Sequence, residues 1–149
     1  MRRSSNPDTF LTPEESGLLA AAIEQAESRT SGEIKVVLVR HCWTDIRVKA
    51  ERLFRKHNLD KTERRNCAMI MVVIANREFL IYGDEGIHEK AGQDFWDDVR
   101  DVMQGEFVRG EFGNGLCKGV RRIGEKLAEF FPYQADDEDE ISDEVVLED

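Results

Sequence analysis

The pattern of apolar and polar residues is most distinctive between positions 62 and 89, where two apolar runs stand close together. The first run, residues 68–75, is apolar at every position, and a short polar break separates it from the second, residues 79–82. Two β-favouring runs joined by so short a break predict an antiparallel hairpin over residues 68–82. A strand that is apolar at every position is typical of a sheet covered on both faces. We therefore expect residues 68–75 to form a central strand with helices above and below it.

Helical and strand patterns alternate along the rest of the chain. A capping box at Thr12 and Glu15 predicts a helix that runs to about residue 28. The remaining predicted elements are a strand at 33–39, a helix at 46–57 capped by Asp45, a helix at 91–103, and a last helix capped by Asn114. A strand, helix, strand order predicts a right-handed crossover between parallel strands. The predicted fold class is α/β: a three-layer α/β/α sandwich whose short mixed sheet contains the hairpin, flanked by about four helices.

The length of 149 residues fits one domain. We expect a flexible N-terminus at 1–9, a domain at 10–133, and a disordered acidic tail at 134–149, because that tail has few apolar residues to offset the entropy of ordering. Ile141 and residues 145–147 are its apolar exceptions and could form a docking segment. Nine of the 31 acidic residues lie at 136–149, so most of the net charge of -10 belongs to the tail. The remainder is near neutral, and we expect no nucleic-acid partner.

Cysteine usage and hydropathy suggest a compartment. The three cysteines are widely spaced and show no metal-ligand spacing, which is typical of reduced thiols in the cytoplasm. No apolar stretch approaches the length of a membrane span, and the first residues carry no apolar signal core. We therefore expect a cytoplasmic protein with no membrane segment.

The predicted topology gathers polar residues at one end of the sheet. The hairpin returns residues 83–86 to the neighbourhood of residues 60–66, and the parallel alignment adds residues 30–33. Oxygen ligands on loops beside glycines suit calcium or magnesium. The candidate ligands are Asp84, Glu85, Glu89, Asp60 and Asn66, with a rim of Thr30, Ser31, Glu33, Thr62, Glu63 and Arg65. The alternative is that residues 83–86 form an ordinary solvated turn and that the hydroxyl groups cap turns.

Other catalytic motifs are missing from the sequence. His88 and Glu89 begin like the HExxH zinc motif, but position 92 is glycine, which excludes a zinc protease on that motif. There is no phosphate-binding loop with its lysine and no nucleophile elbow. The catalytic residues, if the protein is an enzyme, are therefore unknown.

Several of these segments together resemble a known family. The combination is residues 10–15, residues 30–34, Thr62 with residues 65–66, the hairpin, residues 83–87, Gly92, residues 95–96, and Phe107, Gly110 and residues 115–116. In order and spacing it is similar to the TPM domain family, over roughly residues 10–132. The resemblance implies an α/β/α sandwich and a divalent-ion site, usually for calcium, in an acidic crevice at the sheet end. It also implies weak acid phosphatase activity of the kind attributed to plant members.

Three functions remain open from the sequence. The first is a calcium-binding domain that serves as an interaction or assembly module, with a protein partner. The second is a metal-assisted phosphomonoesterase, in which Asp84 or Glu85 would hold the ion. The third is a scaffold that binds partners through its tail. Loop rigidity decides between calcium and magnesium, so the sequence favours calcium only through the resemblance.

Overall fold

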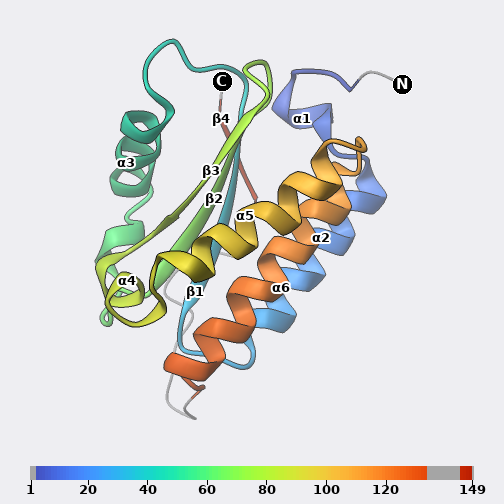
Figure 1. The fold of residues 1–149 in the computed structure, drawn as a ribbon. Helices are drawn as coiled ribbons and strands as arrows, with labels where there is room; N and C mark the ends of the chain where they lie inside the picture. The colour runs from blue at the N-terminus through green and yellow to red at the C-terminus, as the bar shows by residue number, and fades with distance from the viewer. Residues whose placement is uncertain (1–2, 134–144, 149) are drawn as a thin grey trace.

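The computed structural model of the protein describes residues 3–133 and 145–148. In chain order its elements are α1 (Pro7–Phe10), α2 (Pro13–Glu27), β1 (Glu33–Val39), α3 (Ile46–Lys56), the 3-10 helix η1 (Leu59–Lys61), β2 (Cys67–Val73), β3 (Glu78–Gly83), α4 (Glu85–Ala91), α5 (Gln93–Phe107), α6 (Phe112–Phe130) and β4 (Val146–Glu148). Figure 1 shows the sheet standing between α3 on one side and α2, α5 and α6 on the other.

The described strands form one mixed sheet in the order β3-β2-β1-β4. β1 and β2 run parallel, with Glu33 opposite Cys67. β2 and β3 form an antiparallel hairpin, with Ala68 opposite Gly83. The predicted hairpin and the predicted parallel alignment are both confirmed. The crossover through α3 is what allows β2 to run in the same direction as β1.

Two apolar clusters fill the spaces on the two faces of the sheet. On one face, Ala50, Leu53 and Phe54 of α3 pack against alternate residues of β1 and β2. On the other face, the apolar stripes of three helices pack together: Leu19 and Ile23 of α2, Val99 and Met103 of α5, and Leu116, Val120, Ile123 and Leu127 of α6. This arrangement confirms the predicted α/β/α sandwich.

The central position of β2 explains its unbroken apolar run. Every residue of β2 is buried. Met69 and Met71 belong to the cluster under α3, whereas Ala68 and Ile70 belong to the cluster under the other helices. Because successive side chains of a strand point to opposite faces, a strand covered on both sides has to be apolar at every position.

Several element boundaries differ from the prediction. The segment expected to be loose before residue 10 contains α1, which Asn6 caps through its side chain. The expected turn at residues 83–86 is instead the end of β3 and the start of α4, capped by Asp84. α6 begins before Asn114, so this residue is not the cap; its side-chain amide donates to Glu106 instead, at 3.0 Å. In the first two cases a side-chain cap sets the helix start, and in the third the expected cap residue forms a contact with another helix instead.

The expectation of a disordered tail at 134–149 is wrong for its last apolar residues. Val146–Glu148 form β4, which extends the sheet beside β1 in parallel. The apolar segment at 145–147, the exception noted in the sequence, thus docks on this chain's own sheet. Ile141 and the rest of the predicted tail, residues 134–144 and 149, lie outside the described residues.

Candidate functional site

The candidate site lies at the end of the sheet where β1 and β2 begin and β3 ends. Backbone hydrogen bonds connect the three predicted segments there: Glu33 N–H donates to Asn66 O at 3.2 Å, and Asp84 N–H donates to Cys67 O at 3.0 Å. Gly86 N–H donates to Arg65 O at 2.9 Å. The residues around 30–33, 60–66 and 83–87 therefore come together as the hairpin geometry predicted.

Glycine at position 86 permits this close approach. A Cβ atom on Gly86 would lie 2.4 Å from Arg64 O and 2.6 Å from Arg65 O, closer than real Cβ contacts occur. Both obstructing atoms belong to the backbone and have little freedom to move away. The N-terminus of α4 can rest on the 64–65 peptide only because the residue there has no side chain.

An ion pair between Arg65 and Asp84 occupies the centre of the site. Arg65 Nε lies 2.7 Å from Asp84 Oδ2, and Arg65 Nη2 lies 2.9 Å from Asp84 Oδ1. Asp84 Oδ1 also accepts from Glu85 N–H at 2.8 Å and thereby caps α4. Asp84 is 5 % exposed, and its hydrogen bond with Arg65 raises the pKa of the guanidinium above its usual value. This two-pronged geometry is the strong form of a carboxylate–arginine contact.

The other predicted ligands have different surroundings. Glu85 is exposed and lies 3.3 Å from Arg65 Nη1. Glu89 is exposed on α4 and forms no ion pair with a described residue. Asp60 keeps one buried oxygen, Oδ1, that accepts no hydrogen bond from the described residues. Asn66 is buried, and its side-chain amide donates to Ser31 Oγ at 3.5 Å.

The rim residues act mainly in turns and contacts. Thr30 Oγ1 accepts from Gly32 N–H at 3.0 Å and donates to Phe131 O. Thr62 Oγ1 accepts from Asn66 N–H at 3.2 Å. Glu33 is buried at the start of β1, and Glu63 is exposed. The two threonines therefore have the turn-capping role that the sequence left as the alternative.

Sequence reasoning missed one buried carboxylate beside this site. Glu27 of α2 is 7 % exposed, and its Oε2 accepts from Ile34 N–H at 2.7 Å, on the side of β1 that faces away from β2. Burial and the negative charges of Glu33, Glu27 and Asp84 raise the pKa of the Cys67 thiol. The available signal was the position of Glu27, four residues after Ile23, which places it on the buried stripe of the helix.

These positions do not form a ready-made metal site. Among residues 3–133 and 145–148, no group of three or more His, Cys, Asp or Glu side chains is placed to hold an ion together. At this end of the sheet, the absence of such a group follows from the position of Arg65. The guanidinium of Arg65 takes the position beside Asp84 that a cation would need, and both carboxylate oxygens of Asp84 accept from it.

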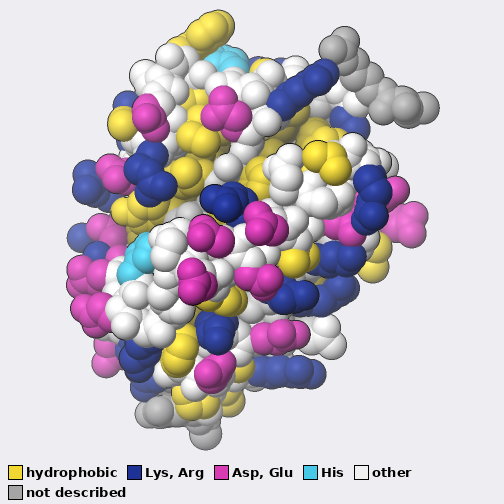
Figure 2. All heavy atoms as spheres, in the orientation of Figure 1, with side chains coloured by type: hydrophobic (Ala, Val, Ile, Leu, Met, Phe, Trp, Pro, Cys, Tyr) yellow, Lys and Arg dark blue, Asp and Glu magenta, His cyan; other side chains and the backbone are white. Residues whose placement is uncertain are grey.

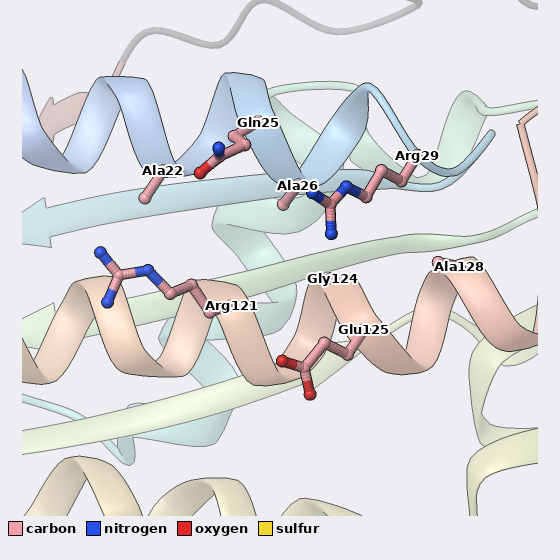
Figure 3. A pocket seen from close by; sticks show the side chains of 8 residues that line it. All are labelled: Ala22, Gln25, Ala26, Arg29, Arg121, Gly124, Glu125 and Ala128. Atoms are coloured by element: carbon pink, nitrogen blue, oxygen red, sulfur yellow. The ribbon is translucent and has the colours of Figure 1, made fainter.

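A separate open groove of about 350 Å³ lies between α2 and α6. Figure 3 shows a floor of small side chains, with Arg29 extending from the turn after α2 and Arg121 from α6 on either side of it. The lining residues are Ala22, Gln25, Ala26, Arg29, Arg121, Gly124, Glu125 and Ala128. None of the residues predicted as ligands or rim residues lines this groove.

The comparisons with known proteins agree with the fold and the site segments. The family profile of the TPM domain matches residues 5–126 of the chain. The chain belongs to the TPM domain family. The match includes every segment of the TPM domain that meets at the Arg65–Asp84 ion pair, so the resemblance noted in the sequence is confirmed. A comparison with curated proteins finds no match.

Solved structures of similar proteins cover nearly the whole chain. The NMR structure of the BA42 protein from the psychrophilic bacterium Bizionia argentinensis is 37% identical, covers 97% of this TPM domain protein and 99% of its own chain, and superposes with a TM-score of 0.90. The N-terminal domain of a P. gingivalis protein is 15% identical, covers 90% and 99% of the two chains with a TM-score of 0.69, and shows the fold alone. No helix within the described residues combines the length and hydropathy needed to cross a membrane.

Proposed function

We propose that the protein is an interaction module whose sheet end binds a divalent cation, with calcium favoured, in exchange for the guanidinium of Arg65. The observation that supports this proposal is the Arg65–Asp84 ion pair, in which an internal cation already neutralises the central carboxylate of the predicted site. A divalent ion would compete with Arg65 for Asp84, so binding would release the arginine and change the surface beside α4.

The chemistry of the surrounding oxygens suits such an exchange. Asp84 offers two oxygens once the guanidinium leaves, and the exposed carboxylate of Glu85 lies within 3.3 Å of the same guanidinium. Asp60 supplies a buried oxygen that accepts no hydrogen bond from the described residues. Its negative charge contributes to raising the pKa of Arg65. Carboxylates on loops and helix starts are the ligands that calcium takes in flexible geometry, whereas magnesium demands a stricter octahedron.

The test is a titration of Arg65→Gln against the unaltered chain. Two charge-assisted hydrogen bonds to Asp84 no longer have to be broken in the variant, so we expect calcium affinity to rise by about tenfold or more. Amide NMR shifts of residues 30–33, 60–66 and 83–90 would report binding after chelator treatment. Arg64→Gln is the matched control, because it removes a neighbouring charge whose side chain donates to Ser31 at 3.0 Å and not to Asp84. Equal affinities for all three proteins would refute the exchange.

The alternative function is a weak metal-assisted phosphomonoesterase that depends on the same cation. Arg65 supports it only indirectly, because a released guanidinium would become available to a phosphate group. Hydrolysis of a generic phosphate ester should then require the added cation and should disappear in Asp84→Asn. Turnover that survives this substitution unchanged would belong to a contaminating enzyme.

A further inference from the structure

The helix α3 carries a concentration of positive charge that the overall composition conceals. Its residues include five bases, Arg47, Lys49, Arg52, Arg55 and Lys56, and a single acid, Glu51. The whole chain has a formal net charge of -10, and without its acidic tail it is near neutral. The tertiary structure places α3 by itself over one face of the sheet (Figure 1), and Figure 2 shows Lys and Arg side chains on that side of the molecule, with acidic side chains among them.

Most of these charges lack an ion-pair partner among the described residues. Lys56 lies 2.9 Å from Glu148 of β4. Arg47, Lys49, Arg52 and Arg55 form no ion pair with any residue in 3–133 or 145–148. Three of the four cations of α6 differ, since Lys118, Arg122 and Lys126 are each paired with a carboxylate. Within the part of the chain that the structure describes, no ion pair therefore neutralises these four side chains of α3.

Apolar side chains stand among these cations. Val48 is 49% exposed and lies on one stripe of α3 with Arg52 and Arg55, at spacings of four and seven residues. Trp43 is 89% exposed and lies two residues before Asp45, the residue that caps α3. Its indole ring rests beside His41 with the ring centroids 5.0 Å apart, so the tryptophan is held outward next to the helix start.

We propose that the α3 surface, defined as Trp43, Arg47, Val48, Lys49, Arg52 and Arg55, docks the protein on an anionic lipid bilayer. Basic residues beside an exposed tryptophan and an aliphatic residue are the composition of helices that lie in the headgroup region of membranes. The arginines meet the lipid phosphates and carboxylates while Trp43 and Val48 enter the interface. Nucleic acid is the less favoured partner, because the exposed Val48 in the middle of the charged stripe offers a phosphate backbone neither a charge nor a hydrogen-bond donor, whereas a bilayer interface accepts apolar side chains.

The acidic character of the whole chain does not prevent this docking. Charges are screened beyond about 8 Å at physiological salt, so a bilayer senses the local surface and not the net charge. Of the nine acids at residues 136–149, the described Glu148 contacts Lys56 and His57 at the end of α3, and neither of these two residues belongs to the proposed surface. Because salt screens the attraction between the basic side chains and the lipid headgroups, binding to the bilayer should fall steeply as ionic strength rises.

The experiment is vesicle flotation of the full chain with phosphatidylcholine alone and with phosphatidylcholine plus phosphatidylserine. We expect binding only to the anionic vesicles and its loss at about 1 M salt. The double substitution Arg52→Gln with Arg55→Gln should lower the partition coefficient by about 25-fold, at about fivefold per arginine. The control is Arg29→Gln with Arg121→Gln, which removes the same charge from the α2–α6 groove (Figure 3) and should change binding by less than about twofold.

Tryptophan fluorescence gives a second and independent measurement. The chain has two tryptophans, and Trp96 is 6% exposed, so a blue shift on adding anionic vesicles should come from Trp43. Trp43→Phe should remove the shift. The proposal is overturned if the two double variants lose binding equally, if no blue shift occurs, or if anionic vesicles are not bound. It is also overturned if a DNA duplex binds more tightly than the vesicles and does so without need of Trp43.

Discussion

At the scale of single residues, arginine–carboxylate contacts decide what the sheet end can do. The sequence placed Asp84 and Glu85 at this end of the sheet and Arg65 on the rim, whereas the structure brings the Arg65 guanidinium into contact with both carboxylates. Arg65 has a φ of 51°, in the left-handed region that disfavours a residue with a side chain. The ion pair with Asp84 helps to offset this cost, which is about 1 kcal/mol. The order of charged residues in the sequence does not show which carboxylate an arginine pairs with in the folded protein.

Glu15 offers a test of the same kind of contact at the other end of the chain. Its hydrogen bonds with Arg3, assisted by those from Thr12 and Gly113 N–H, hold its pKa at about 2 in the folded protein, against an ordinary value of 4.5. A lowered pKa means that the stabilisation is complete above the ordinary value and is lost as the pH falls towards 2. Both side chains are partly solvated, so we expect a loss of about 1–2 kcal/mol.

The measurement is the free energy of unfolding in urea as a function of pH for the unaltered chain and for Glu15→Gln. The variant should show a shallower decline between about pH 5 and pH 2, because its side chain cannot be protonated. Glu129→Gln is the control, since Glu129 belongs to an exposed pair with Lys126 and should leave the slope unchanged. Parallel curves for all three proteins would argue against the Arg3–Glu15 contact.

At the scale of elements, the packing of α2 against α6 rests on one small residue from each helix. A Cβ atom on Gly124 would lie 2.6 Å from the Cβ of Ala26. The two helices are therefore in contact through their backbones at this crossing, and the groove in Figure 3 runs over it. Both helices were predicted from the sequence, but the closeness of their crossing was not, because it depends on two residues that are 98 positions apart.

Gly124→Ala and Gly105→Ala form a matched pair of substitutions. The first inserts a methyl group into the helix crossing and should destabilise the protein by about 1–3 kcal/mol, because α6 has to move away from α2. The second lies inside α5 with nothing within 4 Å of the added Cβ, and the better helix propensity of alanine should stabilise by about 0.5–1 kcal/mol. Urea unfolding of both variants measures the two effects. A stabilising Gly124→Ala would show that the crossing is looser than described.

At the scale of the whole molecule, the C-terminal residues complete the sheet and connect its edge to α3. Arg40 N–H donates to Glu148 O at 2.9 Å. The carboxylate of Glu148 contacts Lys56 at 2.9 Å and His57 at 2.8 Å. β4 therefore links the segment after β1 to the C-terminal end of α3 through these contacts of Glu148. The sequence predicted disorder here because the segment around Val146–Glu148 is rich in acidic residues, so its role as a strand of the sheet was not predicted.

Truncation after residue 144 should expose the edge of β1. We expect faster hydrogen exchange at the Arg40 amide and a lower midpoint of thermal unfolding, because the removed strand takes with it a backbone partner and apolar contacts. The comparison is Glu148→Gln, which loses the charge contacts with Lys56 and His57 and keeps the strand. Its effect should be under about 1 kcal/mol, as is usual for partly exposed pairs. Unchanged exchange at Arg40 after truncation would contradict the pairing of β4 with β1.

The sequence by itself determined the architecture of this protein. Continuous apolar runs in the strands and the period-3.6 spacing in the helices are set by what each element has to bury, so the hairpin, the parallel pair and the helices on both faces were all predictable. The topology in turn fixed which segments meet at the sheet end, because strand direction alone decides where a chain enters and leaves. Residues 30–33, 60–66 and 83–87 were located in this way, before any distance was known.

Only the tertiary structure decided how the charges are paired. Arg65 neutralises Asp84, Glu148 reaches Lys56, and four cations of α3 have no partner among the described residues. Ion pairs join side chains that are distant in sequence, and their energies depend on sub-ångström geometry and burial that a one-dimensional pattern does not contain. The residue types at the sheet end would be consistent with either a metal site or an ion pair. Those of α3 would be consistent with either a neutral or a basic surface. For this protein, the fold follows from hydrophobic periodicity, and the chemistry follows from which charges the fold brings into contact.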